Sequence, residues 1–213
     1  DIPVFLSVVH RRLGNHEAAL ELSEQAREST ISHYRPQSRP ALHINSIHMV
    51  NLAFTGRVQE AGELAEELLV HMDQEFSDRH FFLWASRANA AIVFRSAGEY
   101  ERAYELDRAA LTEIRNLFPD AHITLTAVEV NLGNDLFSLG RLKEARAQDA
   151  AGVELCREFL GEHHIFLTTA RRNLLISRRA LGEDVQEEWE ALRDLYTRSE
   201  ERRVGKECRS RWS

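Results

Sequence analysis

The chain has 213 residues, of which 43% are hydrophobic and 29% are charged, and this composition excludes a largely disordered protein. Only four prolines and ten glycines occur, which is typical of long helices rather than of strands and tight turns. The formal net charge of −7 argues against broad binding to nucleic-acid phosphates. No apolar run approaches the ~20 residues that a membrane-spanning helix needs.

Five glycines divide the chain into equal periods of 42 residues: Gly14, Gly56, Gly98, Gly140 and Gly182. Each period contains two stretches with apolar residues at helical spacing, and the glycine between them can end the first helix in the left-handed conformation. In chain order we expect helices at 4–13, 16–31, 40–55, 58–76, 80–97, 100–117, 122–139, 142–160, 164–181 and 184–197. The sequence therefore predicts five antiparallel helix pairs.

Other positions repeat with the same period. Five residues after the glycine stand Ala19, Ala61, Ala103 and Ala145, and seven residues further on stand Ala26, Leu68, Ala110 and Gly152. Small residues two turns apart on one helix face let helix backbones approach closely, so we expect these positions to be packed. Because one helix pair cannot bury its apolar face alone, the pairs must stack into an all-α solenoid.

Two blocks carry a family resemblance: "NLGNDLFSLGRLKEA" (131–145) and "RRNLLISRRALGED" (171–184). They resemble tetratricopeptide repeats of the 42-residue type, as found in kinesin light chains and in large bacterial signalling NTPases. Asp107 and Asp149, with Arg115 and Arg157, are more similar to the bacterial branch, which includes repeat proteins of the FxSxx-COOH system. The resemblance covers about 1–197 and implies a right-handed superhelix with a concave binding groove.

The two ends of the chain depart from this pattern. Repeats one and two lack the recurring His and Asn, and Glu187 replaces the alanine in repeat five, so the array is expected to fray towards a cap. Residues 198–213 resemble the translation of a sequencing adapter, and we predict a non-native tail that is no part of the fold. The alternative is a basic arm in which Trp212 stacks on a base. Under the first interpretation Cys208 and Trp212 carry no function.

The sequence shows no recognisable catalytic motif: it lacks a phosphate-binding glycine loop, a His-Glu-x-x-His pattern and a Cys-x-x-Cys pair. We therefore predict that the chain is not an enzyme and needs no cofactor. His163 and His164 are adjacent, but successive side chains on a helix diverge, so no metal site is expected. His80, His122 and His164 instead recur because each begins the first helix of its repeat. Cys156 is expected to be buried.

Asparagine recurs nine residues before three of the glycines, as Asn89, Asn131 and Asn173. The resemblance implies that these amides line the concave groove and bind the backbone of an extended peptide, and an amide can both donate and accept hydrogen bonds. The predicted peptide-binding residues are Asn89, Asn131, Asn134, Ser138, Arg172 and Asn173. Arg172 could reach a carboxylate. The alternative is that the asparagines bond a neighbouring helix.

These observations favour a protein- or peptide-binding scaffold that is a fragment of a larger, cytoplasmic bacterial signalling or regulatory protein. Its expected partner is a protein or peptide in the concave groove, with no nucleic acid and no membrane. One alternative is the sensor arm of a signalling NTPase whose catalytic domain lies outside this fragment. Another is a scaffold that associates end to end with itself through its outer repeats.

Overall fold

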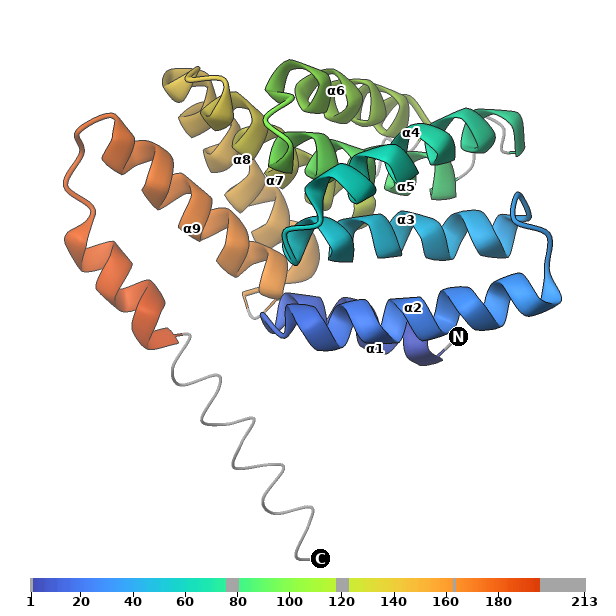
Figure 1. Cartoon of the computed structure of the whole chain (residues 1–213). Coiled ribbons are helices and arrows are strands. Elements are labelled where there is room, and N and C mark those ends of the chain that lie inside the picture. Colours follow the sequence, from blue (N-terminus) through green and yellow to red (C-terminus); the bar gives the residue numbers. More distant parts are fainter. Residues whose placement is uncertain (1, 76–80, 118–122, 163, 196–213) are drawn as a thin grey trace, which may run out of the picture.

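The structure is a computed structural model, and it describes residues 2–75, 81–117, 123–162 and 164–195 (Figure 1). Its labelled helices are α1 (Ile2–Arg12), α2 (His16–His33), α3 (Arg39–Phe54), α4 (Val58–Glu75), α5 (Phe81–Ser96), α6 (Tyr100–Leu117), α7 (Ile123–Ser138), α8 (Leu142–Leu160) and α9 (Ile165–Ala180). A tenth helix follows at 186–195. The predicted all-α solenoid is confirmed, and residues 196–213, with the predicted tail, lie outside the described residues.

The repeating glycine ends the first helix of each repeat, as the sequence predicts. The five glycines have φ values between 71° and 85°, a region that residues with a Cβ atom rarely enter. At Gly140 the amide donates to the Phe137 carbonyl at 3.0 Å, and the Arg141 amide donates to the Leu136 carbonyl at 2.9 Å. This double closure is the Schellman motif, which satisfies carbonyls left open at a helix end.

The recurring alanines are fully packed. Ala19, Ala61, Ala103 and Ala145 are each 0% exposed. Seven residues further on, Ala26, Leu68 and Ala110 are 2%, 1% and 0% exposed, and Gly152 is also buried. The prediction that both positions lie between closely packed helices is confirmed.

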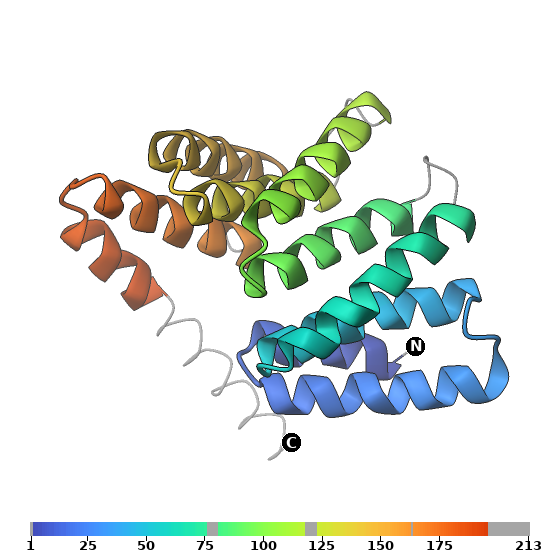
Figure 2. The same ribbon diagram turned by 45° about the horizontal axis from the view of Figure 1, so that its top comes forward.

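The helices form two layers (Figures 1 and 2). The first helices of successive repeats, α1, α3, α5, α7 and α9, each pack against the next first helix. Each of the labelled second helices, α2, α4, α6 and α8, packs between its own first helix and the next one. The backbones of these second helices do not pack against one another, although Arg102 of α6 forms an ion pair with Glu66 of α4. The first helices therefore form the tighter, inner layer of the curve, where the predicted groove would lie.

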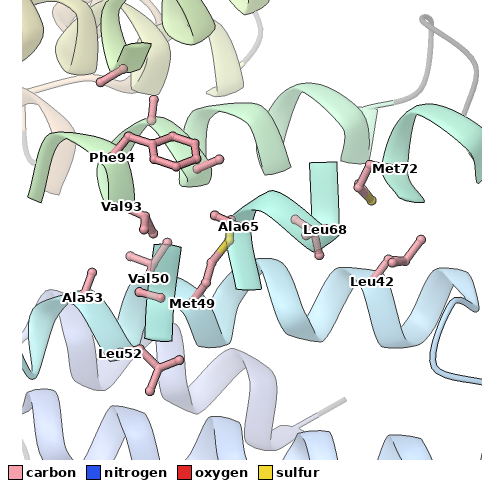
Figure 3. Close-up of a cluster of buried hydrophobic side chains, with 14 of the residues drawn as sticks. Leu42, Met49, Val50, Leu52, Ala53, Ala65, Leu68, Met72, Val93 and Phe94 are labelled. Atoms are coloured by element: carbon pink, nitrogen blue, oxygen red, sulfur yellow. The ribbon is translucent and has the colours of Figure 1, made fainter. Parts of the chain in front are cut away.

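The core runs from repeat to repeat as a chain of apolar clusters. Figure 3 shows the largest, between repeats two (α3 and α4) and three (α5 and α6), where Met49, Val50, Ala65 and Val93 are all 0% exposed. Burying a side chain of this size stabilises the fold by about 1.5–3 kcal/mol. None of the described helices is long and apolar enough to cross a membrane.

Candidate functional site

The predicted peptide-binding residues lie on the inner helices of the last three repeats. α5 carries Asn89, α7 carries Asn131, Asn134 and Ser138, and α9 carries Arg172 and Asn173. Asn89, Asn131, Asn134 and Ser138 are partly buried, Arg172 is exposed, and Asn173 is buried. The shared repeat position therefore does not give the three asparagines one common environment.

Asn173 lies inside the packed array. It is 5% exposed, and its Nδ2 atom has no hydrogen-bond partner among the described residues. Its Oδ1 atom accepts a long hydrogen bond of 3.5 Å from Arg172. Arg172 occupies the position that Ala88 and Val130 hold in repeats three and four, where both are buried at 7% and 5% exposure. Arg172 is thus exposed because it lies at the end of the described array.

Asn131 lies against the neighbouring repeat. Its carbonyl accepts from Nη1 of Arg95 at 3.4 Å. Its amide is close enough to Asp107 to lower the pKa of that carboxyl, although neither oxygen of Asp107 is in full hydrogen-bonding geometry with it. Bonding between neighbouring helices is the alternative that the sequence left open for this residue. On the same helix the Ser138 hydroxyl donates to the Asn134 carbonyl at 2.8 Å, so this bond does not involve the Asn134 amide.

Three repeat positions meet where one repeat packs on the next, and we call this set the joint. It comprises the residues seven before and nine after one glycine and the residue five before the next glycine. In the joint between repeats three and four these are Ala91, Asp107 and Asp135. Both carboxylates have side chains that are 0% exposed. Buried carboxylates are costly unless a cation or hydrogen-bond donors compensate them.

A single cation serves this carboxyl pair. Arg95, with a side chain 16% exposed, forms an ion pair with Asp135 through Nη1, which lies 4.0 Å from Oδ2 of Asp107. Burial raises the pKa of Asp107 well above 3.8, the charge of Asp135 raises it further, and Arg95 opposes the rise. Burial also raises the pKa of Asp135, again against Arg95. Two carboxyls beside one guanidinium therefore favour one bound proton.

The joint between repeats four (α7 and α8) and five (α9 with 186–195) contains a carboxyl without a cation. Asp149 is 3% exposed, and burial raises its pKa to about 6, against the opposing effect of the nearby Ser177 hydroxyl, which itself donates to the Leu174 carbonyl at 3.0 Å. The third joint residue, Gly133, makes room for it, because a Cβ atom there would lie 2.0 Å from Asp149 Oδ1. Any larger residue at this position would therefore have to displace the carboxylate, which gives a reason for a glycine inside a helix.

The joint between repeats one (α1 and α2) and two is polar but uncharged at its centre. Asn51 donates to the Ser7 hydroxyl at 2.7 Å and to the Ala19 carbonyl at 3.0 Å. It accepts from Nη1 of Arg11 at 2.9 Å, and burial lowers the pKa of Arg11 to about 10. Our sequence analysis recognised Asp107 and Asp149 as a repeated position but missed the joints. The pairing of an acidic residue nine after one glycine with a polar residue five before the next was the available signal.

The recurring histidine caps a helix in repeat five, where the structure describes it. His164 precedes α9, and its Nδ1 atom accepts a hydrogen bond from the Phe166 amide at 3.2 Å. This is N-terminal capping, which satisfies an amide that the helix leaves open. His80, His122 and His163 lie outside the described residues. Within the described ranges, no three His, Cys, Asp or Glu side chains gather in a way that could hold a metal ion.

Cys156 is 0% exposed, which confirms its predicted burial. Burial raises the pKa of its thiol to about 11, and the charge of Glu129 adds to this rise. Because the thiolate is the reactive form of cysteine, this side chain acts as a small apolar residue.

Comparison with known proteins agrees with this geometry. Residues 130–165 match a tetratricopeptide repeat model. No curated protein matches the chain. Among solved structures, nearly identical repeats of a putative kinesin light chain from Podosopora anserina share 20% identity at a TM-score of 0.67, covering 93% of this chain and 95% of that one. BtubC from P. vanneervenii shares 20% identity at a TM-score of 0.64, covering 94% of this chain and 79% of that one.

Two further similar structures were solved with bound peptides or factors. A Rap protein complexed with competence and sporulation factor shares 15% identity at a TM-score of 0.71, covering 92% of this chain and 51% of that one. PlcR of Bacillus thuringiensis, in complex with the peptide PapR7 and DNA, shares 13% identity at a TM-score of 0.71, with 92% and 66% covered. These likenesses establish the fold. The predicted resemblance is confirmed: the chain has the fold of tetratricopeptide repeat solenoids of the kinesin-light-chain type.

Proposed function

We propose that the chain is a scaffold that binds a protein or an extended peptide along the inner face formed by its first helices. The observation that carries this proposal is the pair of adjacent inner helices α5 and α7, which both keep an amide side chain partly exposed at one repeat position, Asn89 and Asn131. Asn134 and Ser138 add polar groups along α7. On α9 the row is not continued by Asn173, which is buried, and Arg172 lies at a position that the next repeat covers in repeats three and four. Each hydrogen bond to a ligand would contribute about 0.5–1.5 kcal/mol.

The finer part of the proposal is a role in a bacterial signalling or regulatory protein of the cytoplasm. It is supported by the common fold with Rap and PlcR, whose structures contain a factor and a peptide. A sensor arm attached to a signalling NTPase is the alternative. Sequencing the intact gene decides between them, because a phosphate-binding glycine loop upstream of residue 1 would identify the NTPase.

The binding test uses two asparagines of the inner face and one of the outer layer. The chain serves as bait in a bacterial lysate, and the recovered partner is titrated against wild type, Asn131→Ala, Asn134→Ala and Asn116→Ala. Asn116 is the matched control, because it is exposed near the end of α6, a second helix. We expect several-fold weaker binding for the two inner variants and none of this loss for Asn116→Ala.

Asn134→Ala is the cleaner of the two variants, because Asn131 also lies beside Asp107. A thermal melt of each variant separates lost binding from a loosened fold. Equal affinity for all four proteins would refute the inner face as the binding surface.

A further inference from the structure

An arginine recurs three residues before the glycine in alternate repeats, as Arg11, Arg95 and Arg179. The first two make the same bridge to the next repeat. Nη1 of Arg11 donates to Asn51 Oδ1 at 2.9 Å and lies 3.5 Å from the Ile47 carbonyl. Nη1 of Arg95 donates to Asp135 Oδ1 and to the Asn131 carbonyl, the latter at 3.4 Å.

The targets of both bridges occupy equivalent positions. Asn51 and Asp135 stand five residues before their glycine, and Ile47 and Asn131 stand nine residues before it. The bridge therefore needs an oxygen-bearing side chain and, one helical turn earlier, a main-chain carbonyl that faces the guanidinium. A guanidinium has several donors in a fixed plane, so it can hold both oxygens at once.

Arg179 is the third arginine of this series, and its side chain has no equivalent target among the described residues. It is exposed, and no hydrogen bond or ion pair joins it to another part of the described chain. Unpaired arginines are not a general property of α9, because Arg171 pairs with Glu162 and Arg178 pairs with Glu183 and Glu188.

The described part of the chain also leaves the face of α9 around Arg179 exposed. The positions ten, six and three residues before the glycine differ between repeats three and five. In repeat three they are buried or partly buried: Ala88, Ile92 and Arg95. In repeat five they are exposed: Arg172, Ile176 and Arg179. Ile176 is 36% exposed. The positions that the next repeat covers in the middle of the array thus form an open face with two cations and one apolar side chain.

We propose that this α9 face is a docking surface for a helix of the repeat type that presents an Asp or Asn side chain to Arg179. The occupant has the chemistry of α3 and α7: an acidic or amide side chain, a carbonyl one turn earlier, and apolar contact for Ile176. This surface goes beyond the proposed groove, because it lies at the end of the array. A second copy of the chain fits less well, since its α1 carries Val9 at the position that must accept from Arg179.

The test extends the chain with a helix pair of known chemistry. Residues 114–160 are copied directly after residue 197, which places the copied Gly140 the usual 42 residues after Gly182. The copied Asp135 then takes the position opposite Arg179. Four proteins are compared by urea unfolding: the extended chain, Arg179→Ala, the copied Asp changed to Ala, and the double variant. Arg108→Ala on α6 is the control for loss of an exposed arginine.

We expect each single substitution to raise the equilibrium constant of unfolding about fivefold. The double variant should raise it little more than one single substitution does, because the effects of interacting residues are not additive. Changing the copied Asp to Asn should keep the coupling, as Asn51 does with Arg11. Amide protons of α9 should exchange more slowly in the extended chain than in the original.

Three results would overturn the proposal. The first is additive losses together with unchanged exchange in α9. The second is a copied pair that adds no helix by circular dichroism, because the α9 face then does not accept it. The third is concentration-dependent association of the original chain, seen by light scattering and abolished by Arg179→Ala, which would make a second copy the occupant.

Discussion

The joint between repeats two and three and the joint between repeats three and four have the same backbone plan and opposite chemistry. The first holds Met49, Ala65 and Val93, and the second holds Ala91, Asp107 and Asp135 at the same positions. All six side chains are fully buried. Neighbouring repeats can therefore pack through apolar side chains alone or through buried carboxyls. Both need small residues beside a large one, and the carboxyls also need a cation within reach.

The joint between repeats four and five sharpens this comparison. It keeps a buried acid, Asp149. The position that is equivalent to Arg95, three residues before the glycine, holds Phe137, which brings no charge. The Ser177 hydroxyl lies close enough to lower the pKa of Asp149, and Gly133 leaves space for the carboxyl. Three joints therefore differ in how strongly their stability should depend on pH, and this can be measured.

The largest effect is expected for Arg95→Met. Removing the cation leaves two buried carboxyls uncompensated, so the free energy of unfolding should fall by about 3–5 kcal/mol at pH 8. The loss should be smaller at pH 5, because a proton can then replace the cation. Urea unfolding at both pH values measures this, with Arg11→Met as the matched control, since its partner Asn51 does not titrate. If both variants lose the same free energy of unfolding at both pH values, Arg95 does not compensate a buried carboxyl pair.

The next effect concerns Asp149→Asn. The pKa of Asp149 is raised from 3.8 to about 6 in the folded state, so its protonated form favours folding. Its contribution to stability is greatest below pH 4 and is lost as the pH rises through about 6, with an upper limit of about 3 kcal/mol. The Asn variant should therefore be more stable than wild type at pH 8, and this advantage should shrink towards pH 4.

Comparing the two proteins at each pH cancels the titration of all other groups. A constant difference between wild type and Asp149→Asn from pH 4 to pH 8 would show that Asp149 does not titrate in this range.

A smaller loss is expected for Gly133→Ala. The new Cβ would lie 2.0 Å from Asp149 Oδ1, so the carboxylate must move or α7 and α8 must separate, at a cost of about 1–3 kcal/mol. Combining it with Asp149→Ala should restore much of the stability, because the clash disappears. Thermal or urea unfolding of the two single variants and the double variant checks this. If the two losses of stability simply add, the carboxyl of Asp149 is not the reason for glycine at position 133.

The smallest effect has the opposite sign. Gly62→Ala, inside α4, adds a Cβ that meets nothing within 4 Å. Alanine restricts the unfolded chain and favours the helix, so a gain of about 0.5–1 kcal/mol is expected. The same substitution thus separates crowding at a joint from the ordinary preference of a helix for alanine. A loss at Gly62 as large as that at Gly133 would remove this distinction.

The repeat, the helices and their ends could be predicted from the sequence alone. Gly140 ends a helix because the left-handed conformation is a local property of the backbone, and Ala103 marks the packed face because a small side chain is needed wherever two helices meet. The predicted helix bounds agree with the observed ones within two residues at every described end. Local propensity and period suffice here, since the helices pack within their own pair and against the next one. The contact of Arg12 on α1 with the Phe166 ring on α9 is a longer-range exception made by side chains.

The surroundings of the polar residues could not be predicted from the sequence. Asn89, Asn131 and Asn173 share one repeat position, yet Asn173 is buried and Asn131 lies beside Asp107. Likewise, nothing in the period says that Arg95 reaches Asp135 whereas Arg179 is left open. The physical reason is that a polar side chain takes its role from the groups that the next repeat brings within hydrogen-bonding distance, and that neighbour differs from one repeat to the next.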